Sequence, residues 1–444
     1  MLQTRSHLPV VGIDFGTTNS SVALASEDRG LQLASFSAFG ESTSSFRSVV
    51  YLEQVKTETG RRVHTSTGPA AIEHYLAAEK KGRLIQSLKS YLSSSTFTGT
   101  SIFGRHYTLE RLVSQMLSDL REHAERQFGK PIRHALVGRP VRFVGAESDA
   151  DDAYAVTRLR SAFELAGFES VEFELEPVAA AYSYESTLDH DELILIGDFG
   201  GGTSDFSLLR VGPGVSRRGR SRDSHSEALL GVSGVALAGD AFDARIVRKL
   251  VSPALGSDSF ALSLNKKLPA VPAWIYSNLE RWHYLSFLRT RDVMEILRSA
   301  RLRALEPKKI QALIDLVEED LGYQLHQAVQ RAKFELSHAD AAEFRFSDGS
   351  MDLSIPIGRA DFEAWIADEL HAIEGSVDSL FRSAGVDPLQ VDRVFLTGGS
   401  SFVPAVRRIF NRRFGEDRVR SGNEFTSVAH GLALRAAEAL DHPS

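Results

Sequence analysis

Two stretches of this chain follow one pattern: Gly12-Ile13-Asp14-Phe15-Gly16-Thr17-Thr18-Asn19 and Ile196-Gly197-Asp198-Phe199-Gly200-Gly201-Gly202-Thr203. In each, an apolar run ends in Asp-Phe-Gly, a turn of small residues follows, and a second alternating apolar stretch comes next, at 21–25 and 206–211. This order predicts two β-hairpins, each with a carboxylate beside its bend. Because the device occurs twice, we expect the hairpins to face each other and to grip phosphate groups.

The residue types in these turns indicate how the phosphates are bound. Glycines let backbone N–H groups converge on an anion, and the hydroxyl groups of Thr17, Thr18 and Thr203 add donors without bulk. Carboxylates repel phosphate unless a hard divalent cation lies between them, which indicates Mg²⁺ held through water. The carboxylates in question are Asp14, Asp198 and Asp205. For either segment alone, a glycine-rich turn with one aspartate is also explained by ordinary turn chemistry. Their recurrence favours a site for a nucleoside triphosphate.

Composition excludes several classes of protein. The 444 residues are 43% hydrophobic and 25% charged, which predicts a soluble protein of two or more domains. The apolar runs fall short of the roughly 18 residues of a membrane span, and residues 1–9 have no apolar core typical of a secretory signal, so we expect a cytoplasmic protein. The absence of cysteine excludes thiolate sites, and the net charge of −7 argues against general nucleic-acid binding. The arginine-rich run 217–222 is predicted to be a solvated hairpin loop or, alternatively, a docking patch for an acidic partner.

Local patterns place secondary structure along the chain. Apolar spacing predicts helices over 70–81, over 108–128 with Thr108 as N-cap, over 151–166 ending at Gly167, and over 178–184. A strand is expected at 134–138, and a lobe boundary at 189–192. Beyond Asp243, nearly ninety residues are expected to be helical.

A third glycine turn follows the strand predicted at 391–396. The turn 397–401 leads into a helix with Pro404 in its first turn, and a helix is also expected over 430–440. A strand, a glycine turn and a helix N-terminus together form an anion or ribose site, although a tight strand-to-helix connection has the same pattern.

With these three motifs in this order, the chain resembles the actin-like ATPase superfamily and, within it, the nucleotide-binding domain of the seventy-kilodalton heat-shock chaperones. Four further segments resemble that family: Ser87-Leu88-Lys89, Glu176-Pro177-Val178-Ala179-Ala180-Ala181, Gly239-Asp240-Ala241-Phe242-Asp243, and Arg331-Ala332-Lys333 with Ser337. The resemblance implies an α/β fold of two lobes, each a ribonuclease-H-like sheet flanked by helices. It places lobe I at 1–190, lobe II at 191–423 with a helical insertion at about 251–320, and a helix returning to lobe I at 424–444.

The resemblance also assigns roles to individual residues. It implies ATP or ADP as ligand and Mg²⁺ with its waters between Asp14, Asp198 and Asp205. Lys89 and Glu176 flank the attacking water, with Asp198 and Thr203 as further catalytic residues. The nucleotide-binding residues are Gly16, Thr17, Thr18, Asn19, Gly200, Gly201, Gly202, Thr203, Gly239, Gln330, Lys333, Phe334, Ser337, Gly398, Gly399, Ser400 and Phe402. Lys89 also fits an exposed helix lysine, whereas Asp198 in an apolar strand requires a partner.

Three positions depart from the family pattern at the base site. Phe334 and Phe402 stand where the chaperones have arginines that sandwich adenine, and Gln330 replaces a glutamate that contacts ribose. The two rings either stack on the base, which loosens base discrimination, or belong to the core. Only 45 residues follow Gly399, so neither the interdomain linker nor the peptide-binding domain is expected, as in bacterial YegD-type relatives.

The leading hypothesis is a slow Mg²⁺-dependent ATPase that acts as a chaperone-like switch on an unidentified partner or client protein, without nucleic acid or membrane. Alternatives are a nucleotide-binding interaction module with negligible hydrolysis and a small-molecule kinase of the same superfamily. Filament formation, as in actin, is a further possibility of this superfamily.

Overall fold

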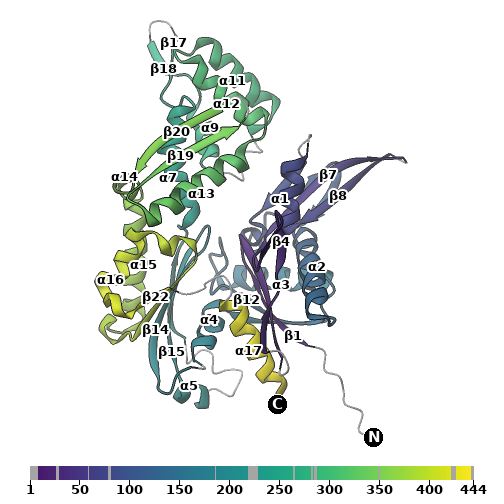
Figure 1. Ribbon diagram of the computed structural model, residues 1–444, viewed down its shortest axis with the longest axis vertical. Helices are drawn as coiled ribbons and strands as arrows, with labels where there is room; N and C mark the ends of the chain where they lie inside the picture. Colours follow the sequence, from purple (N-terminus) through teal and green to yellow (C-terminus); the bar gives the residue numbers. More distant parts are fainter. Residues whose placement is uncertain are drawn as a thin grey trace.

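The structure, a computed structural model, describes residues 9–26, 30–58, 60–78, 82–185, 187–218, 229–263, 266–281, 284, 288–348, 351–421 and 427–441. It has two lobes standing side by side (Figure 1). One large cluster of buried apolar side chains comes from residues between 11 and 171, and another comes from residues between 193 and 419. Each lobe is therefore organised around a core of its own.

The central sheets of the two lobes repeat one topology. In the first lobe the strand order is β13-β12-β1-β2-β3, and in the second it is β22-β21-β14-β15-β16. The strands of the first are β1 (Val10–Phe15), β2 (Asn19–Ser26), β3 (Gly30–Leu33), β12 (His134–Arg139) and β13 (Ser170–Leu175), with β6 (Phe46–Arg47) beside β2. Those of the second are β14 (Glu192–Phe199), β15 (Ser204–Val211), β16 (Leu229–Val235), β21 (Arg393–Thr397) and β22 (Val419–Ser421).

Pairing within both sheets changes direction at the same place. The predicted hairpins β1-β2 and β14-β15 are antiparallel, whereas β1 pairs with β12, and β14 with β21, in parallel. Strand β14 is buried along nearly its whole length, which explains its continuous apolar run. The duplicated sheets flanked by helices confirm the predicted actin-like α/β fold.

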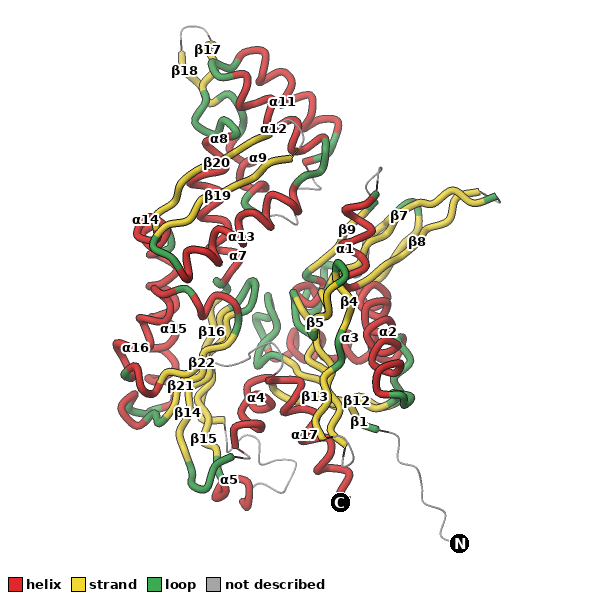
Figure 2. The backbone as a smooth tube through the Cα atoms, in the orientation of Figure 1, coloured by secondary structure: helices red, strands yellow, loops and turns green. Residues whose placement is uncertain are grey.

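Smaller sheets extend the lobes. The first lobe carries the three-stranded sheet β8-β7-β9, whose long hairpin projects from the molecule (Figure 2). These elements are β7 (Val49–Thr57), β8 (Gly60–Thr67), β9 (Arg83–Gln86), and the hairpins β4 (Phe36–Ala38) with β5 (Glu41–Thr43) and β10 (Gly99–Ile102) with β11 (Arg105–Thr108). The second lobe adds the hairpin β19 (Ala341–Asp348) with β20 (Met351–Gly358).

Most helices predicted from apolar spacing are present. The helices of the first lobe are α1 (Gly68–Ala77), the 3₁₀ turn η1 (Leu88–Tyr91), α2 (Leu109–Phe128), α3 (Asp149–Leu165) and α4 (Glu176–Glu185). Thr108 caps α2 by accepting from the Arg111 amide, as predicted. Helix α4 begins two residues earlier than expected and includes Glu176 itself. Of the arginine-rich run, Arg217 and Arg218 end α5 (Pro213–Arg218), and the remainder lies outside the described residues.

The predicted helical insertion is only partly helical. Its described helices are α8 (Ser252–Ala254), α9 (Ala273–Leu279), α11 (Arg291–Arg303) and α12 (Pro307–Glu318). Between α8 and α9, the strands β17 (Phe260–Ser263) and β18 (Lys266–Pro269) form a hairpin, so the expectation that this stretch is helical was wrong for these residues. Apolar periodicity does not separate a short strand from a buried helix segment.

Other helices complete the second lobe and connect the two. They are α7 (Gly239–Ile246), α13 (Gly322–His338), α14 (Arg359–Trp365), α15 (Ala367–Ala384), the 3₁₀ turn η5 (Gly399–Phe402), α16 (Pro404–Phe414) and α17 (Ser427–Asp441). Helix α17 lies on β1 and α4 so closely that a Cβ on Gly431 would be 1.7 Å from the Ala179 carbonyl oxygen. Helix α4 also contacts β15, which joins the bases of the lobes (Figure 1). The residue limits predicted for the lobes stay predictions.

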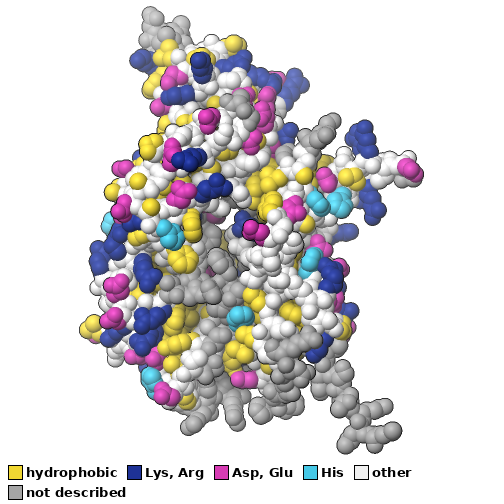
Figure 3. Space-filling model, in the orientation of Figure 1, with side chains coloured by type: hydrophobic (Ala, Val, Ile, Leu, Met, Phe, Trp, Pro, Cys, Tyr) yellow, Lys and Arg dark blue, Asp and Glu magenta, His cyan; other side chains and the backbone are white. Residues whose placement is uncertain are grey.

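The surface gives two further observations. On the face in Figure 3, acidic and basic side chains are interspersed over both lobes. None of the described helices is both long and apolar enough to cross a membrane.

Candidate functional site

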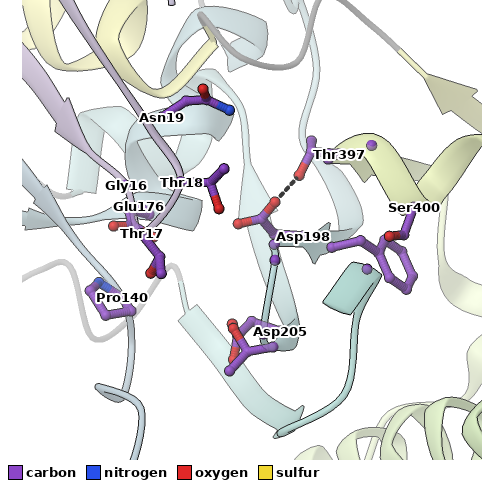
Figure 4. A pocket seen from close by; sticks show the side chains of 18 of the residues that line it. Gly16, Thr17, Thr18, Asn19, Pro140, Glu176, Asp198, Asp205, Thr397 and Ser400 are labelled. Atoms are coloured by element: carbon purple, nitrogen blue, oxygen red, sulfur yellow. Dashed lines mark hydrogen bonds between the residues drawn. The ribbon is translucent and has the colours of Figure 1, made fainter. Parts of the chain in front are cut away.

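A pocket of about 440 Å³ lies between the two central hairpins (Figure 4). It is lined by residues of both lobes, and all the site residues predicted from the sequence are among them. The predicted lining residues are Asp14, Gly16, Thr17, Thr18, Asn19, Lys89, Glu176, Asp198, Gly200, Gly201, Gly202, Thr203, Asp205, Gly239, Gln330, Lys333, Phe334, Ser337, Gly398, Gly399, Ser400 and Phe402. The fold therefore brings into one cavity predicted residues as distant in the chain as Asp14 and Phe402.

The two glycine turns face each other across this pocket. A Cβ on Gly201 would lie 2.9 Å from the Thr18 hydroxyl oxygen, so the turn of the second lobe closely approaches that of the first. A Cβ on Gly16 would lie 2.2 Å from the Asn19 carbonyl oxygen, which leaves room only for glycine. Ser48, which the sequence did not indicate, donates its hydroxyl to the Gly16 carbonyl oxygen at 2.7 Å and braces the first turn.

Three carboxyl groups stand where the hairpin strands meet the turns. Burial, together with the like charges of Glu176 and Asp198, raises the pKa of Asp14 to about 8, and Lys89 opposes this shift. Burial also raises the pKa of Asp205 to about 7, although a hydrogen bond from Thr203 acts in the opposite direction. The pKa of Asp198 is raised by burial as well. Burial and mutual repulsion thus favour the protonated forms of these carboxyl groups when no cation is bound.

Lys89 and Glu176 form an ion pair beside Asp14. The Lys89 Nζ is 2.7 Å from Glu176 Oε1, and the lysine side chain is only 8% exposed. Lys89 lies in the 3₁₀ turn η1. This turn begins after Ser87, whose φ of 56° is in the left-handed region. The alternative of an exposed helix lysine is therefore wrong.

The opposite end of the pocket is formed by α13 and η5. The ammonium group of Lys333 pairs with Asp243 at 2.7 Å and donates to the Gly239 carbonyl oxygen at 3.3 Å. Phe334 is 64% exposed and Phe402 is 42% exposed, although both line the pocket. Neither ring belongs to the core, so that alternative is wrong, and stacking on a base stays a prediction.

The carboxylate-rich wall suits a hard cation with oxygen ligands. The oxygen donors come from both lobes, and a Cβ on Gly234 would lie 2.6 Å from Asp205 Oδ1, so the space around this carboxylate exists only with glycine there. Among the described residues, no three His, Asp or Glu side chains gather closely enough to hold a metal ion. The prediction of Mg²⁺ held through water stays a prediction.

Several residues that line the pocket had no role assigned to them from the sequence, although some lie in the segments described above. They are Ser90, Pro140, Val141, Arg142, Phe143, Val144, Asp240, Asp243 and Thr397, among others. Thr397 donates its hydroxyl to Asp198 Oδ1 at 2.7 Å. Its only signal in the sequence is its place as the last residue before a glycine turn.

Comparison with known proteins gives a consistent picture. Residues 68–268 and 304–440 match the family described as Hsp70 protein. Over 430 residues the chain is 26% identical to the chaperone protein DnaK of Thermosipho africanus, an alignment that covers 96% of this chain and 58% of that protein. The chain thus spans less than two thirds of the length of this curated relative.

Proposed function

The chain belongs to the Hsp70 family, and from this premise we propose that it binds ATP and ADP with Mg²⁺ and hydrolyses ATP slowly as a chaperone-like switch. One observation carries the proposal. Two glycine turns from different lobes, three carboxyl groups and a buried lysine line a single pocket. Phosphoryl transfer depends on this combination, because its transition state requires charge neutralisation and precise positioning more than a strong base.

The turns are proposed to bind the phosphate groups. Backbone N–H groups at 16–19 and 201–203 would converge on the anion from two sides, and the hydroxyl groups of Thr17 and Thr18 would add donors. The Gly200 N–H closes the second turn by donating to the Thr203 carbonyl oxygen at 2.9 Å. The approach of Gly201 to Thr18 supports this arrangement, because a phosphate group beside this contact would meet donors of both lobes.

Mg²⁺ and its waters would lie among Asp14, Asp198 and Asp205. When bound, the cation supplies charge neutralisation on the phosphate oxygens. Deprotonated carboxylates are required to hold it, and in its presence the raised pKa values of Asp14 and Asp205 would fall.

Lys89 and Glu176 are proposed to serve the hydrolytic step. Lys89 would direct its charge at the transferring phosphoryl group, and a Glu176 carboxylate oxygen would orient the attacking water and accept its proton. Thr203, whose hydroxyl donates to Asp205 Oδ2 at 2.9 Å, would hold that carboxylate in place and contact the terminal phosphate.

The base is proposed to lie between Phe334 and Phe402, with Lys333 and Ser337 near the ribose. Aromatic faces stack on any base, so this part of the site would discriminate weakly between adenine and guanine. Partly exposed rings at a pocket support stacking, because burial against a base would remove apolar surface from water.

Nucleotide-dependent closure would make the chain a switch. Helix α4 begins with Glu176 in the pocket and contacts strands of both lobes, so ligands between the lobes can bias their relative position. The altered surface would be read by a partner or client protein.

A nucleotide-binding module with little turnover is the second candidate. The Lys89–Glu176 ion pair favours it, because the lysine contacts the glutamate instead of a phosphate, and the glutamate contacts the lysine instead of a water. The two functions differ in turnover but agree in binding.

Calorimetric titration with ATP, ADP and GTP beside a turnover assay tests both. We expect binding of all three with Mg²⁺, and hydrolysis that is lost in Asp198→Ala but kept in Asp340→Ala, which changes an exposed carboxylate on the same lobe. Binding with turnover no higher than that of Asp198→Ala would favour the second candidate. A chain that binds none of these nucleotides contradicts both.

A further inference from the structure

Four residues form a row across the central sheet of the second lobe. Strand pairing sets Gly234 of β16 beside Asp205 of β15, Asp205 beside Asp198 of β14, and Asp198 beside Thr397 of β21. The row lies at the strand ends that line the pocket, and three of its four members contribute to the lining. Two carboxylates directly opposite each other on antiparallel strands repel, so this pairing opposes the stability of the sheet.

The neighbours on either side restrain the two carboxylates. Thr397 donates its hydroxyl to Asp198 Oδ1 at 2.7 Å, as Figure 4 shows. At the other end of the row, Gly234 leaves space for Asp205, since a Cβ there would lie 2.6 Å from Asp205 Oδ1. In Figure 4 the second carboxylate oxygen of Asp198 points away from Thr397, toward Thr18 on the opposite wall.

We propose that Thr397 is a positioning residue, which rests on the proposed function: it fixes the Asp198 carboxylate so that its free oxygen serves the nucleotide-bound cation. The Cβ–Cγ bond of an aspartate rotates easily, so beside Asp205 and without a partner of its own the Asp198 carboxylate would have no fixed orientation in the pocket. The threonine hydroxyl binds one oxygen and thereby sets the direction of the other. A charge-assisted bond of this kind is stronger than a neutral one, which suits it to hold an anion against repulsion.

The alternative explanation is that Thr397 has only a structural role, as a β-branched residue of strand β21. Threonine is common in strands because its branched side chain fits the pleated surface. Valine has the same shape without the hydroxyl, so Thr397→Val separates the two explanations. Thr397→Ser keeps the hydroxyl and removes the methyl group.

Calorimetric titration of ADP, once with Mg²⁺ and once with EDTA, measures the gain in affinity that the cation provides. We expect Thr397→Val to reduce this gain by about tenfold, the loss of one hydrogen bond to a charged group, whatever its effect on binding in EDTA. Thr397→Ser should retain most of the gain. Thr65→Val, a matched change in strand β8 of the other lobe, should behave as the wild type.

The outcomes separate this inference from the proposed function. If wild type binds ADP and gains affinity from Mg²⁺, but Thr397→Val gains equally, Thr397 has no positioning role and the inference is overturned. A wild type that binds no ADP overturns the proposed function as well. Thermal unfolding of each variant is measured alongside, and if the valine variant is poorly folded, Thr397→Ala is compared with Thr397→Ser. Equal gains in those two would also contradict the inference.

Discussion

Lys89 Nζ donates a hydrogen bond to Glu176 Oε1 at 2.7 Å, although 87 positions separate the two residues in the chain. The pair adjoins Asp14, whose pKa is raised to about 8, first by burial and then by the charge of Glu176. Lys89 is the cation that opposes this accumulation of negative charge. Lys89 therefore compensates part of this charge within the pocket, and under the proposed function it would also serve the phosphates when nucleotide is bound.

Replacing Lys89 by methionine is expected to lower ATP turnover by about 100-fold or more, because the positive charge at the transferring phosphoryl group is lost. Binding of ADP should weaken far less, because the backbone groups of both turns remain. Steady-state turnover and calorimetry measure the two effects. The control is Lys309→Met, which removes a partly exposed lysine outside the pocket that pairs with Glu306 and Asp258. Equal turnover in wild type and Lys89→Met would contradict a catalytic role.

The raised pKa values of Asp14 and Asp205 predict how stability depends on pH. Between the unfolded value of 3.8 and the folded values of about 8 and 7, the folded protein binds more protons than the unfolded chain. Stability without metal should therefore fall as pH rises from about 5 to 8. Thermal unfolding in EDTA across this range measures the slope. Asp14→Asn should flatten the decline, whereas the exposed substitution Asp340→Asn should leave it unchanged. A melting temperature that rises throughout the range contradicts the assignment.

The same shifts predict that cation binding releases protons, because Mg²⁺ requires ionised carboxylates. Titration of ADP with Mg²⁺ at pH 7, in buffers of different ionisation heat, should show proton release that is absent in EDTA. Asp14→Asn should reduce the number of protons released. An enthalpy that does not depend on the buffer would contradict the prediction.

The rings of Phe334 and Phe402 predict that substitutions there weaken binding of the base without affecting binding of the phosphates. Phe334→Ala and Phe402→Ala should each weaken ADP binding by about tenfold, in the range for loss of one stacked aromatic ring. Binding of pyrophosphate should not change, because the phosphate turns lie at the other end of the pocket. Calorimetry with both ligands tests this, and Leu302→Ala removes an equally apolar side chain, 81% exposed on α11, as a control. Parallel losses for ADP and pyrophosphate would show that the rings act through the fold instead.

Features encoded by residues close together in the chain could be predicted from the sequence. The Asp-Phe-Gly turns and the Thr108 cap each depend on residues within a few positions, and all are present. Contacts between distant strands had no such signal: Thr397 meets Asp198 only because β21 pairs in parallel with β14, 199 positions away. The hairpin at 260–269 was missed because its two strands have only four residues each, too few to establish a period of two.

Tyr75 of α1 forms a link between the lobes beyond the pocket. Its hydroxyl donates to the Asp320 carbonyl oxygen at 3.0 Å, and its ring packs edge-on against Tyr323 at the start of α13. Since bound nucleotide would leave by separation of the lobes, Tyr75→Phe should accelerate ADP release by about threefold to tenfold, the effect of one hydrogen bond. Stopped-flow displacement of a fluorescent ADP analogue measures the rate. Tyr51→Phe is a matched control, because the Tyr51 hydroxyl accepts from the Gly82 amide within the first lobe. If both variants accelerate release equally, the effect comes from the shared aromatic cluster and the interlobe hydrogen bond has no separate role.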